Sequence, residues 1–233
     1  MISKGSPCDC LLHFGKEIMS RYKFCVFDFD LTLVDSSKAI LKCYKHTLEK
    51  FGFAIPDDRV IYNTIGKTLA ESFEILTKES DAEKIGQMRA EYVSKADEVM
   101  AKESVFYDDT LAMLQVLQCA GVKVGIVSTK YRYRIVDTFR CHTSSMPVDI
   151  IIGGEDVTLP KPDPQGLELM ISKFGACKED VLYIGDSYID AQTAQNAGVD
   201  FAAVTTGSTT ASEFEKYPNI YIGSSLTDIF LHI

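Results

Sequence analysis

The sequence predicts an α/β fold in which a doubly wound, Rossmann-like parallel sheet carries an inserted α-helical domain. Short apolar runs rich in β-forming residues recur along the chain, and helix-like segments separate most of them. Runs that are apolar on both faces are typical of buried parallel strands, because helices cover both sides of such a sheet. One interval of about seventy residues after the first run shows helical periodicity instead, which indicates an insertion.

The expected core elements follow one another in a regular order. Strands are predicted at residues 24–29, 122–127, 148–152, 181–184 and 201–204. The helix before the second strand has an apolar face, with Asp108 or Asp109 as its N-terminal cap and Gly121 at its end. Helix and strand then alternate to near residue 233, as expected for a chain that winds along one parallel sheet.

The insertion divides the predicted core into two stretches of sequence. Residues 21–35 and 105–233 are assigned to the α/β core, and residues 36–104 to a helical cap domain. Residues 1–20 show no clear periodicity and are expected to be an N-terminal extension that need not be ordered.

Within the predicted cap, one amphipathic helix can be identified from its N-terminal end onward. Asp35, Ser36 or Ser37 can cap it, an apolar stripe follows, and a Phe-Gly-Phe turn ends it before Pro56. Two further helices are expected at residues 69–76 and 82–100.

Composition excludes several classes of protein. The chain has 24 basic and 33 acidic residues and a net charge of −9, without a clustered basic run, so nucleic acid is not an expected partner. No stretch approaches the ~18 apolar residues of a membrane span. Seven cysteines, an odd number mostly within apolar segments, favour a reducing compartment, and we expect a cytoplasmic protein. The pair Cys8 and Cys10 is a weak metal or redox motif.

Acidic, hydroxyl and basic side chains lie at or just beyond the ends of predicted strands. In order they are Asp28, Asp30, Ser128, Thr129, Lys161, Asp186 and Asp190. Ligands of open α/β sheets bind outside the carboxyl ends of the strands, near a topological switch point. A phosphate monoester carries two negative charges, so a carboxylate can attack it only when a divalent cation and a lysine neutralise its oxygens. Together these residues predict a phosphoryl-transfer site.

The first strand ends in a pair of aspartates. Asp28 and Asp30 are two residues apart, so their side chains point to the same side if the extended geometry continues. One can attack phosphorus while the other protonates the leaving oxygen. The alternative, an acidic turn without metal, is the ordinary reading of such a pair in isolation.

The phosphate-binding candidates follow later strands. Ser128 and Thr129 precede a helix-like segment and can offer hydroxyls and backbone N–H groups to phosphate, although either residue could instead cap the helix. Lys161 lies between Pro160 and Pro162, which restrict where its ammonium can go; the alternative is a surface lysine beside a turn.

The last signal supplies the metal-binding candidates. Asp186 follows Gly185 at the end of the fourth strand and suits Mg²⁺, which prefers oxygen ligands. Asp190 lies about one helical turn later and can orient Asp186 or a metal-bound water. Alternatively, both carboxylates complement the dipole of the following helix.

These motifs, in this order, resemble those of the haloacid dehalogenase superfamily of phosphohydrolases, over roughly residue 22 to the C-terminus. The helical insertion resembles the cap of the subfamily that contains phosphoglycolate phosphatases, β-phosphoglucomutases and small pyrophosphatases. The resemblance implies that Asp28 is a nucleophile that forms an aspartyl-phosphate and that Asp30 is the general acid and base. It also implies that Mg²⁺ is held by Asp28, the backbone carbonyl of Asp30 and Asp186, and that Ser128 and Lys161 bind the transferring phosphoryl group.

Two positions add detail to this resemblance. Leu31 stands where a glycine is common, but it is not a reacting group. Residues 63–68 resemble the loop that reads substrate in these relatives, where Gly66 permits a tight turn and Lys67 offers a cation to an anionic leaving group. A solvated loop lysine is the alternative for Lys67.

The function expected from the sequence is a Mg²⁺-dependent phosphatase for a small phosphorylated metabolite, similar to phosphoglycolate phosphatase. An inorganic pyrophosphatase or a phosphosugar mutase would share every core motif. A non-catalytic binding module is disfavoured, because the reacting carboxylates are all present. Dehalogenation and phosphonate cleavage are disfavoured, because neither uses a second acid at the position of Asp30.

Overall fold

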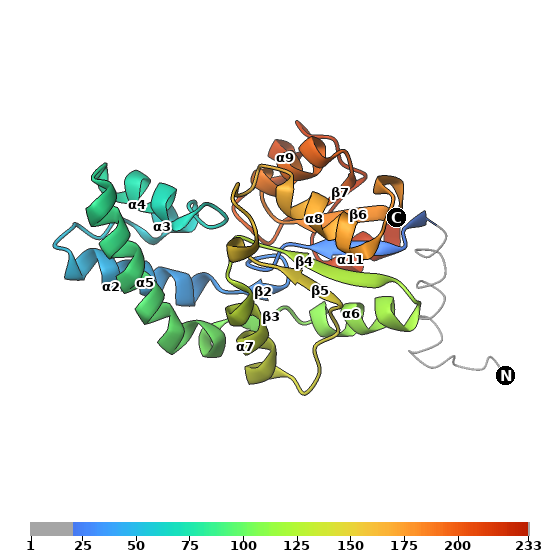
Figure 1. The fold of residues 1–233 in the computed structure, drawn as a ribbon, viewed down its shortest axis with the longest axis horizontal. Coiled ribbons are helices and arrows are strands. Elements are labelled where there is room, and N and C mark those ends of the chain that lie inside the picture. The colour runs from blue at the N-terminus through green and yellow to red at the C-terminus, as the bar shows by residue number, and fades with distance from the viewer. Residues whose placement is uncertain (1–20, 233) are drawn as a thin grey trace.

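A computed structural model describes residues 21–232 (Figure 1). Its centre is a six-stranded sheet in the order β5-β4-β1-β6-β7-β8, and every neighbouring pair is parallel. The strands are β1 (Phe24–Phe27), β4 (Lys123–Val127), β5 (Ile150–Ile152), β6 (Val181–Gly185), β7 (Asp200–Val204) and β8 (Tyr221–Gly223). The five predicted strands are therefore confirmed, and β8 is an addition. The predicted extension at residues 1–20, with Cys8 and Cys10, lies outside the described residues.

Helices cover both faces of the sheet, as a doubly wound fold requires. Two apolar clusters form on opposite faces, and β1 contributes to both: Cys25 and Phe27 belong to one, and Val26 to the other. The first cluster includes α6 (Thr110–Cys119), α7 (Arg132–His142) and α11 (Leu226–His232). The second includes α8 (Gln165–Phe174), α9 (Tyr188–Ala197) and α10 (Ala211–Phe214), and two 3-10 turns occupy Gly154–Asp156 and Lys178–Asp180. The predicted α/β class is confirmed.

Four helices lie between β2 (Val34–Asp35) and β3 (Val105–Phe106) in the chain, on the left of Figure 1. They are α2 (Ser37–Lys50), α3 (Asp58–Tyr62), α4 (Leu69–Thr77) and α5 (Ala82–Glu103). They enclose an apolar cluster of their own, centred on aromatic rings in tilted and edge-to-face contact that include Tyr44, Phe73 and Tyr92. We refer to α2–α5 as the helical insertion. The residue boundaries proposed above for the two domains stay predictions.

Two short strands join the helical insertion to the core. β2 (Val34–Asp35) and β3 (Val105–Phe106) pair in antiparallel register, Val34 with Phe106 and Asp35 with Val105. The entry and exit of the insertion are thus tied together directly beyond β1. Helix α5 also packs along α7 of the core, so the insertion lies over the carboxyl end of the sheet.

Two predicted helix caps differ from expectation in their hydrogen bonds. Asp109 is the N-cap of α6, but its carboxylate accepts from Thr227 N at 2.8 Å instead of capping the helix. Ser36 is the N-cap of α2, yet its hydroxyl donates to Asp30, and the Asp35 carboxylate accepts from Ser37 N at 3.0 Å. Each side chain is used for a tertiary or neighbouring contact. None of the helices within residues 21–232 is both long and apolar enough to span a bilayer.

Candidate active site

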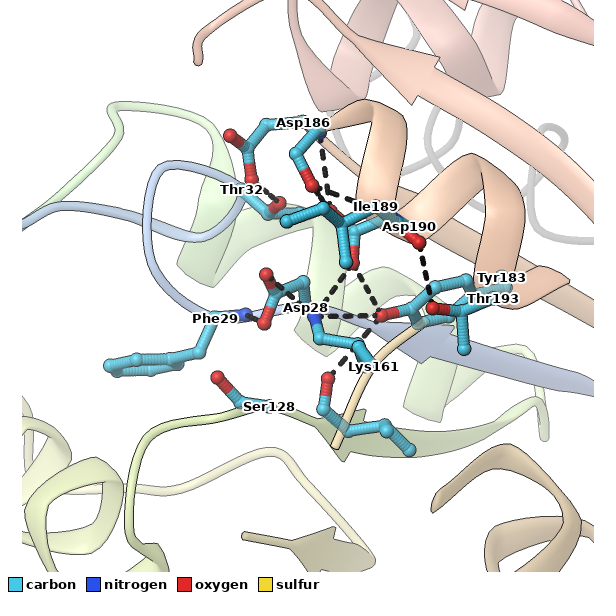
Figure 2. A network of polar contacts seen from close by, with 12 residues as sticks. Asp28, Phe29, Thr32, Ser128, Lys161, Tyr183, Asp186, Ile189, Asp190 and Thr193 are labelled. Carbon is cyan, nitrogen blue, oxygen red and sulfur yellow. Dashed lines mark hydrogen bonds and ion pairs between the residues drawn. The ribbon is translucent and has the colours of Figure 1, made fainter. Parts of the chain in front are cut away.

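The predicted site residues meet at the carboxyl edge of three adjacent strands. Asp28 follows β1, Ser128 follows β4 and Asp186 follows β6, and these strands are neighbours in the order β4-β1-β6. The loop before α8 brings Lys161 between them (Figure 2). Residues far apart in the chain are thereby collected at one point, because the strands are parallel and end together.

A buried ion-pair network joins the nucleophile candidate to a lysine. Lys161 Nζ lies 2.9 Å from Asp28 Oδ2 and 2.6 Å from Asp190 Oδ1, and it also donates to Tyr183 Oη at 3.2 Å (Figure 2). The Lys161 side chain is only 5% exposed, so the surface-lysine alternative is wrong. Asp28 is held from the other side by its own neighbour, since Phe29 N donates to Asp28 Oδ1 at 2.7 Å.

Asp190 contacts different groups from those expected. It was predicted to orient Asp186 or a metal-bound water, but its Oδ1 accepts from Lys161 and, at 2.8 Å, from Tyr183 Oη. Its Oδ2 accepts from Ser187 Oγ at 2.5 Å, which closes a capping box at the start of α9. Asp190 is fully buried. Its role in the structure is to hold Lys161 and the first turn of α9 in place.

Asp186 faces Asp28 across the site. Its Oδ1 accepts from Thr32 Oγ1 at 2.8 Å, and Gly207 approaches so closely that a Cβ there would collide with Asp186 Oδ2. One oxygen from each of Asp28, Asp186 and Asp190 lies within 4.8 Å of the others. Such a group of carboxylate oxygens is the donor set that a hard divalent cation prefers.

The charges of this group are unbalanced without a cation. Burial raises the pKa of Asp28 to about 6, against the lowering effect of Lys161. Burial, together with the charges of Asp190 and Asp28, also raises the pKa of Asp186 well above its ordinary value. For Lys161, burial favours the neutral amine, but Asp190 and Asp28 outweigh it and raise its pKa. When all three carboxylates are ionised, they carry two negative charges more than the Lys161 ammonium offsets, and one divalent ion would balance that excess.

Asp30 lies in a second ion pair that the sequence did not reveal. Its Oδ1 accepts from Lys130 Nζ at 2.5 Å and from Ser36 Oγ at 2.6 Å. Lys130 is buried, with a side chain that is 5% exposed. Asp28 and Asp30 therefore pair with separate buried lysines.

Ser128 and Thr129 occupy the loop between β4 and α7. The N-cap of α7 is Tyr131, so neither residue caps the helix, and that alternative is wrong. Ser128 is 5% exposed, and its hydroxyl accepts from Lys130 N at 3.3 Å. Ser128 lies beside Asp28 and Lys161 (Figure 2), and both hydroxyl residues line a cavity described below.

Leu31 adopts a left-handed backbone conformation, with φ of 61°. This conformation is unfavourable for a residue with a Cβ, by roughly 1–2 kcal/mol, and free of that penalty for glycine. Leu31 N donates to Val34 O at 2.8 Å, and the Leu31 carbonyl accepts from Thr206 Oγ1. Glycine suits this position because the turn after Asp30 requires a left-handed backbone. In this protein the hydrogen bonds to Val34 and Thr206 hold Leu31 in that conformation.

The loop of Gly66 and Lys67 reaches from the helical insertion to the start of α9. Lys67 Nζ donates to Tyr188 Oη at 2.5 Å and lies 5.1 Å from the centre of that ring. Gly66 lies against the core, because a Cβ at this position would be 3.8 Å from Ser187 Oγ, an ordinary van der Waals distance. The structure therefore brings Lys67 to the segment that carries Asp186, although it contacts none of the site carboxylates by hydrogen bond.

Comparisons with known proteins agree with this geometry. A sequence profile described as haloacid dehalogenase-like hydrolase matches residues 25–204. Pyrophosphatase PpaX from Bacillus velezensis is 30% identical over 208 residues, covering 89% of this chain and 94% of that protein. PpaX from Listeria monocytogenes is 33% identical over 177 residues, covering 74% and 78%.

Solved structures give the same fold. A Bacteroides fragilis protein provisionally assigned as a haloacid dehalogenase-like hydrolase superposes with a TM-score of 0.88 at 49% identity, covering 90% of this chain and all of that one. A provisionally assigned phosphoglycolate phosphatase from Lactobacillus plantarum gives a TM-score of 0.79 at 23% identity, covering 91% and 100%. The latter likeness concerns the fold alone.

Proposed function

Because this chain belongs to the haloacid dehalogenase-like hydrolase family, we propose that it is a Mg²⁺-dependent phosphatase that acts on a small phosphorylated metabolite. The observation that carries the proposal is the buried contact of Asp28 with Lys161, at 2.9 Å, opposite a second buried carboxylate, Asp186. A carboxylate held beside an ammonium at the end of a central strand is positioned to attack a bound phosphoryl group.

In the proposed first step, an Asp28 oxygen attacks phosphorus, and the bond from phosphorus to the leaving oxygen breaks. Asp30 donates a proton to that oxygen, so the leaving group departs with this oxygen as a hydroxyl group. Lys161 and Ser128 bind the phosphoryl oxygens. The product is an aspartyl-phosphate on Asp28.

In the second step, water attacks the same phosphorus. Asp30, now ionised, accepts the water's proton, and the bond between phosphorus and the Asp28 oxygen breaks to release phosphate. The ion pair of Asp30 with Lys130, at 2.5 Å, supports this role because it holds the carboxylate within the site. Asp30 ends the cycle protonated, ready for the next substrate.

Two of the three grouped carboxylates can bind Mg²⁺, whereas the third, Asp190, is engaged by Lys161. We propose that Asp28, Asp186 and the backbone carbonyl of Asp30 hold the ion, and that Asp190 stays bound to Lys161. When bound, the ion supplies positive charge that offsets the phosphoryl oxygens. Thr32 would then fix the orientation of the Asp186 carboxylate through its 2.8 Å hydrogen bond.

A pyrophosphatase is the second candidate. It is supported by curated relatives named PpaX at about 30% identity. Its first step would be the same, with a second phosphate as the leaving group. A phosphosugar mutase would differ only in the group that attacks the aspartyl-phosphate. A binding module without turnover would not need the lysines that pair with Asp28 and Asp30.

A turnover screen tests the proposal. Phosphoglycolate, pyrophosphate, hexose phosphates and nucleotides would be ranked by kcat/KM, with and without Mg²⁺. Asp28→Asn, prepared identically, controls for contaminating phosphatases. We expect Mg²⁺-dependent release of phosphate from a small monoester, with pyrophosphate as the nearest competitor. No release above the Asp28→Asn background from any substrate would refute a phosphatase.

We further propose that the protein works in a reducing, cytoplasmic compartment. Free thiols support this: within residues 21–232 the cysteines are unpaired, and Cys25 and Cys43 are fully buried as small apolar side chains. Mass spectrometry after alkylation of freshly lysed cells would report their oxidation state directly.

A further inference from the structure

A cavity of about 330 Å³ lies between the helical insertion and the site. Its core wall includes Ser128, Thr129 and Lys161, where the phosphoryl group is proposed to bind. Its opposite wall comes from the insertion, with Lys67 in the loop before α4 and Arg89 on α5. The leaving group of a bound substrate would therefore extend from the core wall toward α5.

One face of α5 forms that wall. Arg89, Tyr92, Val93 and Met100 all line the cavity, and their spacing of three, four and eleven residues places them on one side of a helix. Tyr92 and Met100 are buried, whereas Arg89 is exposed. The face thus presents an apolar floor with a single guanidinium at its edge.

Most cations on the cavity wall already have an anionic partner. Lys130 pairs with Asp30, Lys161 pairs with Asp28 and Asp190, and Arg134 donates to Asp97 at 2.8 Å. Two cations differ. Lys67 is bonded to a tyrosine hydroxyl, and Arg89 makes no ion pair and no side-chain hydrogen bond within residues 21–232.

The lack of a carboxylate partner is informative in this chain. With 33 acidic residues against 24 basic ones, acidic partners are plentiful, and three lysines of α2, Lys42, Lys45 and Lys50, each pair with a carboxylate. Two cations without a carboxylate partner on one cavity wall produce a local positive potential that favours an anion. Arginine in particular matches the planar geometry of a carboxylate or phosphate, with two parallel hydrogen bonds.

We propose that Arg89, assisted by Lys67, binds a second anionic group on the leaving group of the substrate. The inference rests on the proposed function, because it places the reacting phosphoryl group at Ser128 and Lys161. It narrows the substrate class to phosphate esters or anhydrides whose leaving group carries a carboxylate or another phosphate. The cavity is at the small end of the range for ligand pockets, roughly 300–1,000 Å³, so the leaving group has few atoms.

Binding of non-hydrolysable phosphonates tests this inference without turnover. Phosphonopropionate carries a carboxylate tail, methylenediphosphonate a second phosphoryl group, and propylphosphonate a neutral tail. Their dissociation constants would be measured by isothermal titration calorimetry with excess Mg²⁺. The proteins are wild type, Arg89→Ala, Arg89→Lys and Lys102→Ala. Lys102 is an exposed cation on the same helix and does not line the cavity, so its variant matches the change of charge.

We expect the wild-type protein to bind at least one anionic-tailed phosphonate more tightly than propylphosphonate, by about tenfold or more. Arg89→Ala should abolish that preference, Arg89→Lys should keep part of it, and Lys102→Ala should keep all of it. Preference for the carboxylate or for the second phosphonate identifies which leaving group the site reads. Equal affinity for all three ligands, a preference that survives Arg89→Ala, or no binding at all would overturn the inference.

Turnover of p-nitrophenyl phosphate in the same preparations separates this inference from the proposed function. A protein that hydrolyses this substrate but shows no preference for anionic tails contradicts the role of Arg89 alone. A protein that shows the preference, lost in Arg89→Ala, but hydrolyses nothing contradicts the phosphatase alone.

Discussion

Replacing Lys161 by methionine should destabilise the protein and do so in a pH-dependent way. Methionine has a similar length but no charge, so the substitution leaves Asp28, Asp186 and Asp190 buried together without a cation. Removing one partner of a buried ion pair typically costs about 3–5 kcal/mol. We expect a loss of that order in the free energy of unfolding at about pH 8 without Mg²⁺.

The sign of the pH dependence follows from the raised pKa of Asp28, about 6 in the folded protein. An unfolded aspartate has a pKa near 3.9, so folding favours the protonated form. This contribution to stability is fully present below about pH 4 and is lost as the pH rises through about 6. Without the Lys161 ammonium the pKa of Asp28 rises further, so the variant should lose stability with rising pH more steeply than the wild type.

Urea unfolding at about pH 5 and pH 8, with and without Mg²⁺, measures these effects. The deficit of Lys161→Met should be largest at the higher pH without metal. It should shrink at the lower pH, where the raised pKa values of Asp28 and Asp186 favour their protonated forms, and on addition of Mg²⁺, which supplies the missing charge. Lys173→Met, an exposed position on α8, should behave as wild type. A Lys161→Met deficit that is absent, or equal at both pH values, would refute the electrostatic account of the site.

Three further predictions concern the metal and the substrate. Asp186→Ala should raise the Mg²⁺ concentration needed for half-maximal activity by tenfold or more, roughly the effect of losing one of few protein ligands; an unchanged metal titration would place the ion elsewhere. Stabilisation by Mg²⁺, measured as a shift in melting temperature, should grow as the pH rises through about 6, because Asp28 must lose its proton to bind the ion; a shift independent of pH would contradict the donor set. Lys67→Ala should lower kcat/KM for substrates with anionic leaving groups, by a factor that corresponds to about 1–3 kcal/mol of lost transition-state stabilisation. The loss should be smaller for p-nitrophenyl phosphate. Equal losses on both would instead indicate a general effect on the helical insertion.

The sheet could be predicted because its strands are apolar on both faces. β4 and β6 bury every residue except Lys123, and such runs stand out in a sequence. β8 is short and half-buried at the edge of the sheet, and β2 and β3 have two residues each. Elements of that length leave no periodic pattern, so only the tertiary structure defines them.

The site was predictable to the extent that its residues follow strands. Asp28 and Asp186 come together because adjacent parallel strands end at one edge. The partners that fix them were not predicted: Thr32 reaches Asp186 across 154 positions of sequence, and Lys130 reaches Asp30 across 100. The sequence offered one signal for these partners: Thr32 lies shortly after Asp28, and Lys130 lies shortly after Ser128. Arg89 gave none, because only the packing of α5 brings it to the cavity.

The central claim is that Asp28 accepts the phosphoryl group, and trapping that intermediate tests it most directly. Wild-type protein would be mixed with its best substrate and Mg²⁺, quenched in acid within the first turnover, digested and analysed by mass spectrometry. Acyl-phosphates survive in acid long enough for the modified peptide to be sequenced. We expect the mass of one phosphoryl group on Asp28, absent from Asp28→Asn and from samples without Mg²⁺. Rapid turnover with no modified Asp28 at any quench time, or a phosphoryl group on another residue, would contradict the account.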